Sequence, residues 1–143
     1  MQIVARAEPR YYIELTEADA TLIHDVVLKL AFRSPEKYHK AAELTAGWRQ
    51  YLDIRKNYRK TCEAAGYTVQ TSQTVNVAHA QLEVVNQALS KAGPMDLERA
   101  ERLTSIRSLF TEMMESTSRE FRQYEMSMIS RLSAQQTTRQ SRP

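Results

Sequence analysis

Glycine and proline are scarce in this chain, and this scarcity is the feature that most limits the folds open to it. Its 143 residues include three glycines and four prolines, and no proline lies between Pro35 and Pro94. Because proline breaks a helix and glycine weakens one, long stretches without them favour long helices. We therefore predict a mainly α-helical protein: a helical bundle with a long antiparallel helical hairpin and a short N-terminal β segment.

The β segment is predicted at residues 2–15. Tyr11, Ile13 and Leu15 alternate with Tyr12 and Glu14, which is the period of a strand with one buried face. A turn at Glu8-Pro9-Arg10 would let residues 2–7 pair with residues 11–15. Such a hairpin is marginal by itself and needs a helix or another strand against it.

A first helix is predicted at residues 16–31. Thr16 is suited to cap its N-terminus, with Asp19 at the position from which a side chain reaches back to the cap. One face of this helix carries a continuous apolar stripe, made of Leu22, Ile23, Val26, Val27 and Leu30. We expect that stripe to face the core.

A second, longer helix is predicted at residues 35–65. Ser34 stands at the capping position and Pro35 at the first helical position, where proline is favoured. Gly66 is suited to the left-handed residue that ends many helices.

A third helix is predicted at residues 72–92. Val75, Ala78, Leu82, Val85, Leu89 and Ala92 follow one another at alternating spacings of three and four. This spacing is that of a heptad seam, as in a coiled coil. Gly93-Pro94 would end the helix and turn the chain into an antiparallel pair with the next helix.

A fourth helix is predicted at residues 96–132, capped by Asp96. Its apolar stripe runs along Leu103, Ile106, Phe110, Met113, Thr117, Phe121, Tyr124, Met128 and Leu132. Its second half either overhangs the preceding helix or bends back across the earlier ones, and the weak helix formers Ser116-Thr117-Ser118 mark where a bend could occur. Residues 133–143 are a polar tail, and residues 1–132 are predicted to form a single domain.

The sequence contains no pattern typical of catalysis or of metal binding. His24, His39 and His79 fall on three different predicted helices, and none has a second ligand at metal-site spacing. Three glycines are too few for a phosphate-binding loop. We therefore expect no enzyme activity, no catalytic or metal-ligating residue and no cofactor.

Basic residues gather on the second predicted helix beside aromatic ones. They are Arg49, Arg55, Lys56, Arg59 and Lys60, interleaved with Tyr51 and Tyr58. Charge for phosphates and rings for stacking are what nucleic-acid binding uses. The alternative interpretation is a solvated helix face whose long stems cover apolar surface, and we prefer it because Asp53 and Glu63 dilute the charge.

The leading hypothesis is a non-catalytic interaction protein or structural subunit of a larger assembly. A helix of nearly forty residues is longer than a domain of this size can cover, so part of its stripe needs a partner, either a second copy or another subunit. The residues predicted to bind that partner are Phe110, Met113, Phe121, Tyr124, Met128 and Leu132. Nucleic-acid association through the basic residues is the second hypothesis.

The apolar stretches are too short to cross a bilayer, and the N-terminus lacks the apolar core of a signal peptide. The single cysteine, Cys62, fits a reducing compartment. We therefore expect a soluble protein with no membrane partner, in the cytoplasm or within an assembled particle. Virion or secretion accessory proteins are one class with this character.

Overall fold

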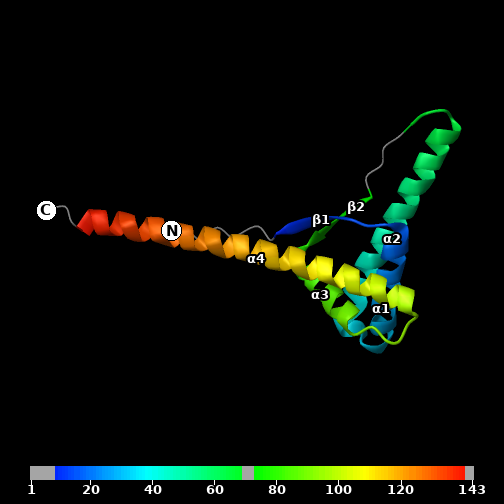
Figure 1. The fold of residues 1–143 in the computed structure, drawn as a ribbon, viewed down its shortest axis with the longest axis horizontal. Helices are drawn as coiled ribbons and strands as arrows, with labels where there is room; N and C mark the ends of the chain where they lie inside the picture. The colour runs from blue at the N-terminus through cyan, green and yellow to red at the C-terminus, as the bar shows by residue number, and fades with distance from the viewer. Residues whose placement is uncertain (1–8, 69–72, 141–143) are drawn as a thin grey trace. The chain divides into compact units, whose positions relative to one another are not determined.

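The computed structural model describes residues 9–68 and 73–140, apart from the side chains of Phe121, Tyr124, Glu125 and residues 132–140. Its contacts divide the chain into unit 1, Met1–Phe110, and unit 2, Thr111–Pro143. In chain order the elements are β1 (Arg10–Glu14), α1 (Glu17–Arg33), α2 (Pro35–Ala64), β2 (Thr74–Ala78), α3 (His79–Ser90) and α4 (Leu97–Gln140). The predicted mainly helical fold with a short β segment near the N-terminus is confirmed (Figure 1).

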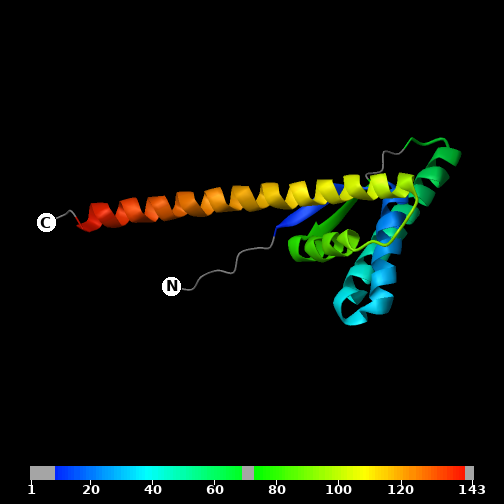
Figure 2. The same ribbon diagram turned by 60° about the horizontal axis from the view of Figure 1, so that its bottom comes forward.

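Helices α1 and α2 form an antiparallel helical hairpin and lie side by side in both views (Figures 1 and 2). The predicted hairpin was a different one, between residues 72–92 and residues 96–132, and the pairing of α1 with α2 was not predicted. Thr16 Oγ1 accepts a hydrogen bond from the Asp19 amide at 3.1 Å, so the predicted cap of α1 is confirmed. Ser34 separates the helices and Pro35 opens α2 as predicted, although the Ser34 side chain makes no capping hydrogen bond.

The end of α2 also follows its sequence signal. Gly66 has a φ of +86°, a left-handed conformation that residues with a side chain rarely adopt. In that turn the amide of Tyr67 donates to the carbonyl oxygen of Cys62 at 2.9 Å. The helix therefore ends where glycine permits the chain to reverse.

The third predicted helix, residues 72–92, is wrong in its first part. Residues 74–78 are the strand β2, which pairs antiparallel with β1, so that Arg10 lies opposite Ala78 and Ile13 opposite Val75. The expected partner segment of residues 2–7 lies outside the described residues. Val75 and Val77 are buried while Asn76 between them is exposed, which is strand alternation by β-branched residues.

The rest of that predicted helix is confirmed as α3. Its seam residues Leu82, Val85 and Leu89 are buried, and α3 lies beside the two strands in both views (Figures 1 and 2). The largest fully buried side chains of unit 1 come from both strands and all four helices: Phe110, Ile13, Ile23, Leu52, Leu82, Leu89, Val27, Val77, Val85 and Thr45. The sheet and the helices therefore share one core.

Helix α4 contributes to unit 1 through its first turns, where Leu103, Ile106 and Phe110 are buried. Asp96 Oδ1 accepts from the Arg99 amide at 3.3 Å, which confirms the predicted cap. The chain remains helical through Ser116–Ser118, and a bend there stays a prediction. The described part of unit 2 is this one helix, residues 111–140. Among the described residues, no helix has the length and apolarity required to cross a membrane.

Candidate functional site: one helix face and two charged surfaces

The three histidines are held at separate places. Within residues 9–68 and 73–140, no three His, Cys, Asp or Glu side chains lie close enough to hold a metal ion. His39 Nδ1 donates to the carbonyl oxygen of Pro35 at 2.7 Å, one turn away on the same helix. His79 Nδ1 meets the hydroxyl of Tyr11 at 2.8 Å, which links the start of α3 to β1. The first contact lies within α2, and the second joins two elements of the fold.

His24 is the most buried of the three histidines. Its Nδ1 lies 2.9 Å from Thr45 Oγ1 across the α1–α2 hairpin. The Thr45 hydroxyl also lies 3.0 Å and 3.2 Å from the carbonyl oxygens of Ala41 and Ala42, one turn back on α2. When the hydroxyl donates to one of these carbonyl oxygens, Thr45 Oγ1 accepts the hydrogen of His24 Nδ1. The contact joins α1 to α2.

Burial lowers the pKa of His24 below its ordinary value, and the nearby Arg49 guanidinium lowers it further, while Asp25 acts in the opposite direction. The neutral ring is therefore the folded form. In the unfolded chain the pKa returns to about 6.5. Below that pH the unfolded state binds a proton that the folded state does not, so acid favours unfolding.

We expect the free energy of unfolding to fall as the pH is lowered from 7.5 to 5.0, and part of that slope to come from His24. Urea denaturation at each pH measures it, with His24→Asn as the comparison variant. The variant should show a shallower dependence on pH across this range. If the free energy of unfolding of His24→Asn depended on pH as steeply as that of the wild type, then the lowered pKa of His24 would not contribute to acid unfolding.

Of the five basic residues of α2 predicted to bind nucleic acid, four lie beyond Leu52, after which no residue of the helix is buried. Two of them are engaged within the chain. Lys56 Nζ pairs with Glu17 Oε2 at 3.0 Å. Arg55 Nε donates to the hydroxyl of Tyr51 at 2.9 Å, and its guanidinium lies 5.3 Å from the centre of that ring. The cation predicted to bind a phosphate and the ring predicted to stack on a base are thus already in contact with each other.

The other three of the five predicted residues, Arg49, Arg59 and Lys60, differ in their surroundings. Arg49 lines a shallow cleft of about 480 Å³ between α1 and α2, together with His24 and Asp53. Arg59 is half-buried and Lys60 is exposed. Nucleic-acid binding by this helix stays a prediction.

The residues predicted to bind a partner fall into three groups in the structure. Phe110 is fully buried in the core of unit 1, so it is not available to a partner. Met113 is half-buried and Met128 is 41% exposed. The side chains of Phe121, Tyr124 and Leu132 lie outside the described residues. Met126 and Ile129, which are 69% and 62% exposed, were not in the predicted set because they lie off the stripe.

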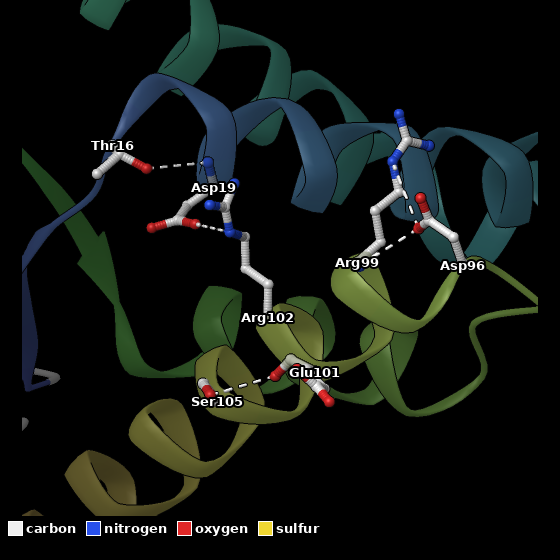
Figure 3. Close-up of polar contacts among 7 residues, drawn as sticks. All are labelled: Thr16, Asp19, Asp96, Arg99, Glu101, Arg102 and Ser105. Carbon is white, nitrogen blue, oxygen red and sulfur yellow. Dashed lines mark hydrogen bonds and ion pairs between the residues drawn. The ribbon is translucent and has the colours of Figure 1, made fainter.

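Ion pairs between α1 and the start of α4 were not predicted from the sequence. Figure 3 shows Arg102 directed at Asp19, with its Nε 3.5 Å from the Asp19 carboxylate. The expected return of the Asp19 side chain to its own helix cap is therefore replaced by a contact with α4. The two residues are far apart in sequence, and no local pattern reveals their pairing.

A second charged surface lies at the other end of α1. Lys29 and Arg33 of α1, Lys91 after α3 and Arg99 of α4 line a cleft of about 360 Å³. The one signal in the sequence is the spacing of Lys29 and Arg33, which places both on the same side of a helix. That they meet Lys91 and Arg99 is a result of the tertiary fold.

No known protein family, curated protein or solved structure matches this chain.

Proposed function

We propose that this protein is a non-catalytic association subunit, in which residues 111–140 of α4 pair with a helix of another chain. The observation that carries the proposal is the apolar stripe of this helix, where Met113 is half-buried and Met128 is 41% exposed. The described part of unit 2 contains no further element.

The physical reason is that a lone helix gains little stability in water. Most helical stability in proteins comes from burying an apolar face, and isolated helices depend on favourable intrinsic propensities. This segment contains several weak helix formers, among them Ser116, Thr117 and Ser118. At 100° per residue, Met113 and Met128 lie on the same side of the helix. That side of unit 2 is the apolar stripe predicted from the sequence.

The charges on this helix favour a second copy in antiparallel orientation as the partner. Of the charged side chains described in unit 2, the acidic ones are Glu112, Glu115 and Glu120, and the basic ones are Arg119, Arg122 and Arg131, so that two of the acidic residues precede every basic one. An antiparallel copy that overlaps residues 111–131 brings Glu120 level with Arg122 of the other chain. Opposite charges along the flanks of a helix pair favour that orientation.

Exchange of Met128 for glutamate tests the proposal, because it places a charge within the stripe. We expect the wild-type chain to dimerise and Met128→Glu to weaken the dimer by at least about tenfold, since burying an unpaired charge is costly. Sedimentation equilibrium over a range of concentrations measures the dissociation constant. Circular dichroism checks that the variant is folded.

Met126→Glu is the matched control. It changes the same residue type on the same helix, but two residues correspond to 200° around the axis, which places Met126 on nearly the opposite side from Met128. We expect its dissociation constant to stay close to that of the wild type. A wild-type chain that remains monomeric at high concentration, or equal losses in the two variants, would refute the proposal.

Such a subunit would act in the cytoplasm or within an assembled particle. The lone thiol of Cys62 supports this proposal, because it makes no disulfide that would need an oxidising compartment.

A further inference from the structure

The cleft at the C-terminal end of α1 combines an apolar floor with a charged rim. Leu22 and Val26 of α1 are buried beneath it, and Leu30 is half-buried. The connection from Ala92 to Met95 forms one wall. The cleft measures about 360 Å³, which is within the usual range for small-molecule sites.

The rim carries more positive than negative charge. Four cations line it, Lys29, Arg33, Lys91 and Arg99, against the carboxylates of Asp25 and Asp96. Asp96 is already engaged, since its Oδ1 lies 4.0 Å from Arg99 Nε, as Figure 3 shows. In the part of the chain that the structure describes, Lys29, Arg33 and Lys91 make no ion pair, and neither does Asp25.

The surroundings of Tyr38 show the same excess of positive charge. The ammonium groups of Lys37 and Lys91 lie 5.4 Å and 5.8 Å from the centre of its ring. Its hydroxyl is buried and has no hydrogen-bond partner among the residues described. Lys91 beside that hydroxyl lowers the pKa of Tyr38 below its ordinary value, although burial acts the other way. The potential at this end of unit 1 thus favours an anion.

We propose that this cleft binds a small organic phosphate, with the phosphate held by Lys29, Arg33 and Lys91 and the organic group resting on Leu22, Val26 and Leu30. A phosphate fits better than a carboxylate because three cations that make no ion pair line the same cleft, two from α1 and one from the end of α3. A dianion can neutralise more of these charges than a monoanion can. Guanidinium binds phosphate oxygens through two parallel donors, and lysine adds a mobile point charge. The apolar floor adds affinity for the group that carries the phosphate.

The test uses phenyl phosphate as the probe on the full chain, with inorganic phosphate and benzoate for comparison. Isothermal titration calorimetry gives the affinities, and amide chemical shifts locate the site. Phenyl phosphate is expected to bind more tightly than either comparison compound, because inorganic phosphate lacks the apolar group and benzoate carries one charge. Shifts should gather at residues 22–33 and 91–99.

The double variant Lys29→Gln/Lys91→Gln is expected to weaken phenyl phosphate binding by about tenfold or more, since each lost charge-assisted hydrogen bond contributes on the order of one tenfold factor. Lys40→Gln/Arg107→Gln is the control. It lowers the net charge equally at exposed positions outside the cleft and is expected to leave the affinity within about twofold.

Three results would overturn the proposal. The first is the absence of binding at millimolar phenyl phosphate. The second is an equal loss of affinity in the two double variants, which would mean that only net charge matters. The third is much tighter binding of a single-stranded oligonucleotide that depends on Lys29 and Lys91, which would identify the cleft as part of a nucleic-acid surface. A failure of α4 to dimerise affects none of these measurements.

Discussion

Replacement of Val77 by aspartate is expected to unfold the protein, or to lower its free energy of unfolding by more than about 4 kcal/mol. Val77 lies in β2 opposite Tyr11 of β1, and its side chain is fully buried. An aspartate there would place a carboxylate in the core of unit 1, where the surrounding side chains are apolar. Urea denaturation followed by circular dichroism measures the change.

Asn76→Asp is the control, one residue away in the same strand. Asn76 is exposed, and its side-chain oxygen accepts from Arg10 Nε at 2.9 Å, a contact that a carboxylate preserves. We expect a change below about 0.5 kcal/mol. The two variants also test whether residues 74–78 form a strand or a helix. In a helix with Val75 and Ala78 on its seam, residue 77 lies off the seam, so a mild effect of Val77→Asp would contradict the strand.

Phe110→Ala is expected to lower the free energy of unfolding by about 3–5 kcal/mol, as is typical for a phenylalanine removed from a packed core. Phe110 has no exposed surface and is the largest of the fully buried side chains. The variant therefore leaves a cavity that the neighbouring side chains fill only in part. The same denaturation experiment measures its cost.

Leu109 provides the comparison for this second prediction. It is the preceding residue of α4 and is 45% exposed. Leu109→Ala should cost less than about 1 kcal/mol, because half of its surface is already in water. If the two variants lose similar stability, then the first turns of α4 do not complete the core of unit 1. Phe110 would in that case rejoin the residues available to a partner.

The sequence predicted those elements whose signals are local. Thr16 and Asp96 cap the helices that they were expected to cap, and Gly66 takes the left-handed conformation at the end of α2. Each of these signals depends on a few neighbouring residues. The N-termini of α1, α2 and α4 could therefore be predicted before any tertiary contact was known, whereas the N-terminus of α3 and the α1–α2 hairpin were not predicted.

Strand β2 was missed because its residues satisfy two periods at once. Val75 and Ala78 fit the heptad spacing of α3, whereas Val75 and Val77 fit the alternation of a strand. A short apolar run does not separate these cases. The decisive fact is that β1 lies alongside and needs a partner for its backbone groups. That requirement comes from a segment more than sixty residues away.

The candidate binding surfaces also divide into features with a local sequence signal and features that depend on tertiary contacts. The apolar stripe of α4 was visible in the sequence as a repeat, but the burial of Phe110 was not, because it depends on where unit 1 ends. The cleft at the end of α1 was missed altogether. Its cations come from α1, from α4 and from the connection between α3 and α4, and only the fold brings them together. Whether the stripe or the basic residues of α2 bind anything stays a prediction.

The pairing of Arg10 with Ala78 has a consequence for the order in which the protein is made. On the ribosome, β1 emerges while β2 has yet to be translated, so Tyr11 and Ile13 wait without their partner strand. The α1–α2 hairpin needs no residue beyond Ala64 and can form meanwhile, since local contacts assemble faster than distant ones. During that interval, a chaperone that holds extended apolar segments would find one in residues 10–14.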